Sequence, residues 1–137
     1  SEIARIVNLS SAAQSTINIQ ALEGKTALGA NEAYAQSKLA LTMWSFYLAE
    51  QEPSITVMAV NPGSLLNTKM AKEAYGQHWS PAEKGVDILY NLSMTDLAKT
   101  GQYFDNDKGF YSDAHPDAHN KEEIKKLIDT TETIVVH

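Results

Sequence analysis

The chain has 137 residues, of which 43% are hydrophobic and 20% charged, and its formal net charge is -6. This composition predicts one globular domain, and the acidic balance argues against nucleic acid as a main partner. The absence of cysteine excludes disulfides and thiolate metal sites and favours a reducing compartment. Because no signal peptide opens the chain and no apolar run approaches the roughly 20 residues of a membrane span, we expect a cytoplasmic protein.

The first predicted element is a short buried strand, because residues 5–11 (RIVNLSS) pass from a β-branched apolar run into small hydroxyl side chains. Residues 12–31 lose that pattern and predict a long loop with room for a helical turn. A helix is predicted over about residues 32–50 and ends before Pro53. Its apolar residues are spaced for one buried stripe: Ala35, Leu39, Met43, Phe46 and Tyr47.

The second half of the chain predicts two more strands and two more helices. Residues 55–63 (ITVMAVNPG) form a nearly continuous apolar run, which predicts a strand buried on both faces. Ser80, Pro81 and Glu83 form a capping pattern at the start of a helix, and Gly101 is its predicted end. Residues 101–105 predict a third strand and residues 106–120 a turn-rich stretch. A final amphipathic helix contains Ile124, Leu127 and Ile128.

Strands and helices alternate along the chain, which predicts an α/β fold with parallel strands joined by right-handed crossovers. We expect a single domain over residues 1–137. In open sheets of this kind, ligands bind at the carboxyl ends of the strands. Ser10 and Ser11 follow the first predicted strand, and Asn61, Pro62 and Gly63 end the second. These two strand ends are therefore candidate parts of a site.

Tyr34 and Lys38 form the motif with the clearest chemistry. Positions four apart on a helix are neighbours, so the two side chains share one face. A tyrosine that exchanges protons near neutral pH needs its anion stabilised, and an adjacent ammonium favours that charged form. Ser11 or Ser10 could hydrogen-bond a substrate oxygen beside them. For a bare Tyr-x-x-x-Lys, an amphipathic helix with a solvated lysine is the commoner interpretation, so the neighbouring motifs must decide.

Three motifs in order resemble the C-terminal half of the short-chain dehydrogenases/reductases. They are RIVNLSS at residues 5–11, YAQSK at residues 34–38 and VNPG at residues 60–63. They stand at a strand end, a helix start and a strand end, as in the family. Residues 61–70 and 101–118 further resemble a bacterial subgroup of its single-domain branch. The resemblance implies part of a doubly wound parallel sheet, the C-terminal half of a Rossmann-type fold with three α/β/α layers.

The resemblance also implies an activity, the nicotinamide-dependent oxidation of an alcohol or reduction of a carbonyl. Tyr34 would be the catalytic acid/base. Lys38 would stabilise its anion and hydrogen-bond the nicotinamide ribose. Ser11 would orient the substrate, with Ser10 as the alternative. The cofactor would be NAD or NADP.

Pro62 and Gly63 would lie against the nicotinamide ring by the same resemblance. A hydroxyl soon after this Pro-Gly pair usually meets the carboxamide in the family, and Thr68 is the candidate. Thr68 lies one residue later than the common spacing, which leaves Asn67 or a backbone group open. The interval from Ser11 to Tyr34 is longer than in many members, so it predicts an inserted loop on the substrate side.

The chain contains no G-x-x-x-G-x-G or G-x-G-x-x-G turn, the motif that cradles the cofactor pyrophosphate. We therefore expect the N-terminal nucleotide-binding half to be absent from this chain, together with the residue that selects NAD or NADP. The strand at residues 5–11 would then be an unpaired edge. The expected partners are that missing half, in cis or in trans, and a small alcohol or carbonyl substrate. A homo-oligomer is also expected, since the family often assembles through the helix that carries the tyrosine.

Two other functions stay open. The chain could be a catalytically silent fragment, or a binding or scaffold protein of the same fold, which a lack of nicotinamide binding would favour. It could instead come from an epimerase or lyase of the wider superfamily, which would retain bound cofactor without net redox change. We expect no metal site, because Pro116 places His115 and His119 in a turn-rich loop with no evident third ligand.

Overall fold

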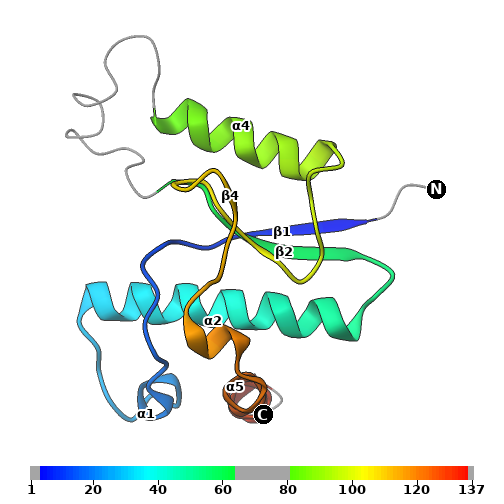
Figure 1. Cartoon of the computed structure of the whole chain (residues 1–137). Coiled ribbons are helices and arrows are strands. Elements are labelled where there is room, and N and C mark those ends of the chain that lie inside the picture. Colours follow the sequence, from blue (N-terminus) through cyan, green and yellow to red (C-terminus); the bar gives the residue numbers. More distant parts are fainter. Residues whose placement is uncertain (1–3, 64–80, 136–137) are drawn as a thin grey trace.

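The computed structural model describes residues 4–63 and 81–135, and within them strands and helices alternate as predicted (Figure 1). The strands are β1 (Arg5–Leu9), β2 (Thr56–Asn61), β3 (Tyr103–Asp105) and β4 (Phe110–Tyr111). The helices are α1 (Ile19–Leu22), α2 (Ala30–Gln51), α4 (Pro81–Met94), the 3-10 helix η1 (Pro116–His119) and α5 (Lys121–Val135).

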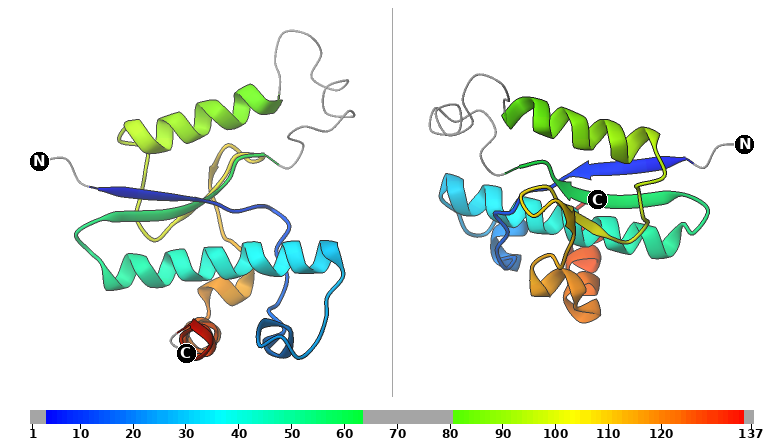
Figure 2. Two further views of the ribbon diagram at one scale, coloured as in Figure 1. Left: turned by 180° about the vertical axis from the view of Figure 1, so that it is seen from behind. Right: turned by 45° about the horizontal axis from the view of Figure 1, so that its top comes forward.

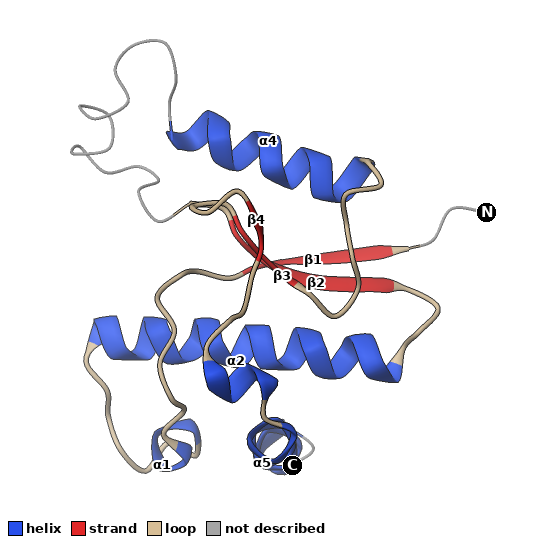
Figure 3. Ribbon diagram, viewed as in Figure 1, coloured by secondary structure: helices blue, strands red, loops and turns tan. Residues whose placement is uncertain are grey.

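The strands form one open sheet in the order β1-β2-β3-β4 (Figure 3). β1, β2 and β3 are mutually parallel, with Leu9 beside Val60 and Asn61 beside Asp105. This confirms the predicted α/β class and the predicted parallel strands. β4 was not predicted: it is two residues long and runs antiparallel to β3 within the turn-rich stretch. Because the three parallel strands end at the same edge, the segments that follow β1 and β2 meet there.

Helices cover both faces of the sheet. α4 lies on one face and α2 on the other, and α1, η1 and α5 lie beyond α2, as Figures 1 and 2 show from several sides. The carboxyl ends of β1 and β2 and the first turns of α2 are on the same side of the molecule (Figure 1). The fold therefore brings the start of α2, which carries Tyr34 and Lys38, to the strand ends.

The described residues bury two apolar clusters on opposite sides of the sheet–α2 unit. One lies between the sheet and α4, and it consists of Met58, Val60, Ile88, Leu92 and Phe104. The other contains Leu39 and Met43 of α2 with Ala118 of η1 and Leu127 of α5. The centre of the stripe predicted for α2 is therefore buried, but it packs on η1 and α5 rather than on the sheet.

The side of α2 that faces β1 is instead small and polar. The Asn8 amide donates to the Ser45 hydroxyl over 2.8 Å, and the Ser10 and Thr42 hydroxyls share a hydrogen bond of 2.7 Å. Ser10, Thr42 and Ser45 are buried, so these bonds satisfy polar groups that water does not reach. The short side chains allow the helix to lie close to the strand.

The end of α4 differs from the prediction. The helix ends at Met94, seven residues before Gly101, which was the predicted terminator. Arg5 of β1 reaches the last turn and donates to the carbonyl oxygens of Leu92 and Thr95. A guanidinium there satisfies free carbonyls and complements the negative end of the helix dipole. Gly101 has a φ of 71° and lies in the turn that enters β3.

β1 has a strand neighbour on one side only within the described residues. The Ser10 amide donates to Val60 and the Thr56 amide to Ala4, so even-numbered residues of β1 face β2. In a parallel ladder the odd-numbered residues then present their backbone groups to the other side, and these include Val7 and Leu9. The predicted unpaired edge is present in this part of the chain.

Among residues 4–63 and 81–135, none of the helices has both the length and the apolarity to cross a membrane.

Candidate active site

Tyr34 and Lys38 lie next to each other in the first turns of α2. The Lys38 Nζ is 5.5 Å from the centroid of the Tyr34 ring, and the Tyr34 side chain is 50% exposed. A cation at this distance from an aromatic ring is attracted by its π-electrons. The spacing predicted this adjacency. The exposed phenol can meet a molecule that approaches from solvent.

The Lys38 ammonium is also tied to the sheet. Its Nζ donates to the Leu9 carbonyl oxygen over 2.9 Å. Leu9 is the last residue of β1, and this carbonyl points to the side of β1 away from β2. The bond fixes the ammonium between the end of β1 and the Tyr34 ring.

Ser10, the alternative to Ser11, is fully engaged in the protein interior. Its side chain is 4% exposed, and its hydroxyl bonds Thr42 at 2.7 Å and the Lys38 carbonyl at 3.3 Å. Whichever of these two oxygens it meets, the Ser10 hydroxyl hydrogen has an acceptor inside the fold. Ser10 therefore anchors α2 to β1.

Ser11 is in the opposite situation. Its hydroxyl oxygen accepts a hydrogen bond from the Ala13 amide over 3.1 Å, and the residue is partly exposed. Within the described residues the hydroxyl hydrogen has no acceptor, so it is free to donate to a substrate oxygen. This difference favours Ser11 over Ser10 for the substrate-orienting role, which stays a prediction.

Pro62 and Gly63 follow β2 at the same edge of the sheet. Gly63 has a φ of 142°, a conformation that residues with a Cβ rarely adopt, and its amide donates to the Asn61 side chain over 3.1 Å. The Asn106 amide donates to the Pro62 carbonyl over 2.9 Å. Thr68, the remaining predicted cofactor residue, lies outside the described residues.

Asn61 is a residue that the sequence argument quoted without giving it a role. It is buried, and its amide nitrogen donates to the carboxylates of Asp105, at 3.1 Å, and Asp107, at 2.8 Å. Its oxygen accepts from Gly63, as described above. Asn61 therefore holds the Pro-Gly turn after β2 against the end of β3.

Gln14 and Tyr103 were missed by the sequence argument. The Gln14 amide nitrogen donates to the Ser11 carbonyl over 2.7 Å, and the Tyr103 hydroxyl reaches the same oxygen at 3.3 Å. Burial, and then the nearby carboxylates of Asp105 and Asp107, raise the pKa of Tyr103 above its ordinary value. Tyr103 is 92 residues from Ser11 in the chain, so no local pattern could have indicated this contact.

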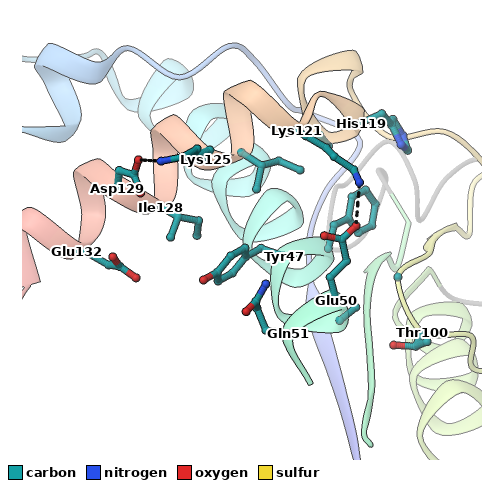
Figure 4. A pocket seen from close by; sticks show the side chains of 15 residues that line it. Tyr47, Glu50, Gln51, Thr100, His119, Lys121, Lys125, Ile128, Asp129 and Glu132 are labelled. Atoms are coloured by element: carbon teal, nitrogen blue, oxygen red, sulfur yellow. Dashed lines mark hydrogen bonds and ion pairs between the residues drawn. The ribbon is translucent and has the colours of Figure 1, made fainter. Parts of the chain in front are cut away.

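A cavity of about 690 Å³ lies at the other end of α2 and does not include the predicted site residues (Figure 4). Phe46 and Tyr47 line it, at least twelve residues after Tyr34, or ~18 Å along a helix. Two salt bridges line this cavity: Lys121 pairs with Glu50 at 3.8 Å, and Lys125 pairs with Asp129. A smaller cavity of about 270 Å³ lies at the strand ends and is lined in part by Gln14 and Tyr103.

His115 and His119 are used in local structure. The His115 Nδ1 accepts from the Asp117 amide over 3.1 Å, and the His119 Nε2 accepts from the Ala114 amide over 3.0 Å. In the part of the chain that the structure describes, no group of three or more metal-ligating side chains gathers at one place.

The open, mostly parallel sheet has helices on both faces, and the Tyr34–Lys38 pair lies beside the carboxyl end of β1. The chain is a distant homologue of a short-chain dehydrogenase/reductase. It is 38% identical over 115 residues to polyprenol dehydrogenase from Danio rerio, and the alignment covers 71% of this chain. The chain spans 35% of the length of that relative. No family model matches the chain.

Proposed function

We propose that this chain supplies the catalytic half of an NAD(P)-dependent oxidoreductase that oxidises an alcohol or reduces the corresponding carbonyl. The observation that carries the proposal is the position of Lys38. Its ammonium lies against the Tyr34 ring and is held by the Leu9 carbonyl at the end of β1. A solvated surface lysine would not need that anchor. The distant homology to polyprenol dehydrogenase supports the same class.

The residues present fit one end of a nicotinamide cofactor. Lys38 is the candidate donor to the ribose hydroxyls, and Pro62 and Gly63 would lie along the nicotinamide ring. The positive φ of Gly63 requires a residue without a Cβ, which leaves the backbone open to close approach by a flat ring. When bound, the nicotinamide would accept or give the hydride. The choice between NAD and NADP is outside what these residues control.

The proton steps belong to the residues of this chain. In the oxidation direction Tyr34, as its anion, takes the proton from the alcohol oxygen, and in the reduction direction it returns that proton to the carbonyl oxygen. The Lys38 ammonium, 5.5 Å from the centroid of the Tyr34 ring, is the cation beside the phenol in this exchange. Ser11 donates its free hydroxyl hydrogen to the same substrate oxygen and orients it.

The proposal requires a second half, in cis or in trans. The sequence lacks a glycine-rich turn to hold the pyrophosphate, and β1 has an open edge on which another parallel strand could pair. We propose that the nucleotide-binding half pairs there. Assembly of several such units into a homo-oligomer is part of the proposal by family resemblance.

The test uses the protein in which this chain is joined to, or mixed with, its nucleotide-binding half. Reduction of the nicotinamide cofactor is followed by its absorbance with a panel of alcohols. Polyprenol, the alcohol in the relative's name, is tested first. Tyr34→Phe should remove nearly all turnover and leave cofactor affinity largely intact. Lys38→Ala should weaken cofactor binding as well as turnover. Tyr47→Phe, the same change at the other end of α2, is the matched control.

Other outcomes point to the alternative functions. Unchanged turnover in Tyr34→Phe would refute the assignment. A protein that binds no dinucleotide would be a silent fragment or scaffold of this fold. A protein that retains a dinucleotide tightly, without net redox change, would be an epimerase or lyase. Fluorescence of the dinucleotide that co-purifies separates these two cases.

A further inference from the structure

The Ser11 carbonyl accepts hydrogen bonds from two side chains outside the proposed catalytic group. The donors are the Gln14 amide at 2.7 Å and the Tyr103 hydroxyl at 3.3 Å. A carbonyl oxygen has two lone pairs, so these bonds use its capacity. One donor comes from the loop after β1 and the other from β3. They hold the Ser11–Ala12 peptide from two directions.

This peptide needs such support because it lies beyond the sheet. β1 ends at Leu9, and the Ser10 amide makes the last bond to β2, at 2.8 Å. After that point the chain enters the loop, and side chains instead of a neighbouring strand supply the hydrogen bonds to the Ser11 backbone carbonyl. The orientation of the Ser11 backbone is thus fixed by Gln14 and Tyr103.

Both donors are themselves fixed. The Gln14 side-chain oxygen accepts from the His115 amide over 3.1 Å, so the side-chain amide is bonded at both ends and cannot flip. Tyr103 is 3% exposed and lies in β3. Because burial keeps its phenol neutral, Tyr103 stays a hydrogen-bond donor across the ordinary pH range.

The hydroxyl of Ser11 is oriented by the same backbone. Its oxygen accepts from the Ala13 amide, which leaves the hydroxyl hydrogen to point elsewhere. If the Ser11–Ala12 peptide rotates, the Ala13 amide and the hydroxyl move with it. The small cavity at the strand ends lies beside this turn, since Ala12, Gln14 and Tyr103 all line it.

We propose that Gln14 and Tyr103 are positioning residues, which clamp the Ser11 carbonyl and thereby aim the Ser11 hydroxyl at the substrate oxygen. This inference rests on the proposed function. It assigns neither residue a contact with the reacting atoms. It explains why a buried tyrosine, and a glutamine whose side-chain amide is hydrogen-bonded at both ends, contact the same loop carbonyl.

The test is a double-mutant cycle in the protein that carries both halves. Gln14→Met and Tyr103→Phe are made with Ser11 present and again in Ser11→Ala. With Ser11 present, each change should lower kcat roughly tenfold without changing the KM for nicotinamide, because a small misplacement of a catalytic group has large effects. In Ser11→Ala neither change should lower kcat further. Gln20→Met and Tyr90→Phe make the same changes at exposed positions and should be silent.

Three results of this cycle contradict the clamp. Equal losses in both backgrounds mean general damage to the fold, and no loss in either means that the contacts do not matter. A rise in substrate KM that persists in Ser11→Ala would mean that Gln14 touches the substrate directly, which also contradicts a positioning role.

A second readout does not depend on turnover. Ser11–Ala12 is the one Ser-Ala pair in these 137 residues, so carbonyl-13C serine with 15N alanine labels this peptide selectively in NMR. Gln14→Met should shift the Ser11 carbonyl resonance, and Gln20→Met should not. If no alcohol turns over and Ser11→Ala changes nothing, the proposed function fails. If the Ser11 carbonyl resonance does not shift in Gln14→Met, the clamp is refuted whatever the outcome for the proposed function.

Discussion

Ser10 and Ser11 are neighbours in the sequence with opposite surroundings: the Ser10 hydroxyl is buried against Thr42, whereas the Ser11 hydroxyl accepts only from the Ala13 amide within the described residues. Adjacent residues at the end of a strand point to opposite sides. The Ser10 side chain therefore faces α2, and the Ser11 side chain does not.

This difference predicts separable effects for the two serines. Ser10→Ala should lower the free energy of unfolding by about 1 kcal/mol, the usual net value of a hydrogen bond. It should lower kcat much less than Ser11→Ala does, because the Asn8–Ser45 bond still sets the register of α2 on β1. Ser11→Ala should leave stability unchanged and lower kcat roughly 100-fold, because it removes a donor to the developing oxyanion. Urea unfolding and steady-state kinetics measure both, and a reversed pattern would exchange the two roles.

The Glu32 carboxylate accepts a hydrogen bond from Ser15 in the loop after β1, and we expect this anchor to weaken in acid. Hydrogen bonds from Gln36 and then Ser15, at 2.9 and 2.8 Å, lower the pKa of Glu32 below its ordinary 4.5. A lowered folded-state pKa means that the stabilisation is complete above about 4.5 and is lost as pH falls through the lower folded value. The effect should be small, since the group is exposed.

The Glu32 prediction is measured by an NMR titration of the Ser15 and Asn18 amides. Their resonances should move together as Glu32 is protonated, because Gln36 also accepts from Asn18 over 2.8 Å. In Glu32→Gln this acid step should disappear. A step of the same size in that variant would assign it to another group.

The buried phenol of Tyr103 should make the folded protein less stable at alkaline pH. Burial raises the pKa of Tyr103 above its ordinary value of 10.0, so the phenol stays protonated in the fold when it would ionise in the unfolded chain. Stability from this group is complete below about pH 10 and decreases as pH rises toward the folded value. Tyr103→Phe should flatten the decrease in melting temperature above pH 10. Tyr90→Phe, at an exposed position, should keep it, and an unflattened curve in Tyr103→Phe would contradict the burial argument.

Arg5 predicts a stability contribution at a distant helix end. Arg5→Met removes the donor to the Leu92 and Thr95 carbonyls and should lower the free energy of unfolding by about 1 kcal/mol. Arg5→Lys retains the charge at the helix end and should lose less. Urea unfolding of both variants provides the measurement. Equal losses would show that the guanidinium hydrogen bonds, and not the charge at the helix end, support α4.

The open edge of β1 predicts association. The isolated 15.0 kDa chain should self-associate with rising concentration, and the nucleotide-binding half should suppress this. Val7→Pro removes an amide from the open edge without touching the bonds to β2, so it should weaken pairing with the other half. Analytical ultracentrifugation decides the matter. If the isolated chain is monomeric and cooperatively folded and does not bind the nucleotide-binding half, the two-half proposal is refuted.

Much of the fold could be predicted because its signals are local. Continuous apolar runs indicated β1 and β2, and the spacing of Tyr34 and Lys38 placed both on one face of α2. Gly101 misled the prediction because α4 ends where Arg5, from the first strand, supplies the cap. β4 has only two residues, too few for a periodic pattern.

The support of the candidate site was harder to predict than its main residues. Tyr34 and Lys38 belong to one short motif, and Ser11 follows a recognisable strand. The bonds that hold them join residues far apart in the chain, such as Tyr103 with Ser11 or Asn61 with Asp107. A single sequence carries no signal for such contacts. The roles of Ser11, Tyr34, Lys38, Pro62, Gly63 and Thr68 stay predictions.

The polar contacts between α2 and β1 have a consequence for precision. The hydrophobic effect is not directional, so apolar burial by itself does not depend on the angle between two groups. Hydrogen bonds are directional and short, so Asn8–Ser45 and Ser10–Thr42 permit a single register of helix against strand. The position of the Tyr34 phenol relative to the sheet edge is therefore set by bonds made two and three helical turns away. The same polar contacts that satisfy buried groups would thus also serve the proposed role of Tyr34, which needs its phenol held at a fixed place.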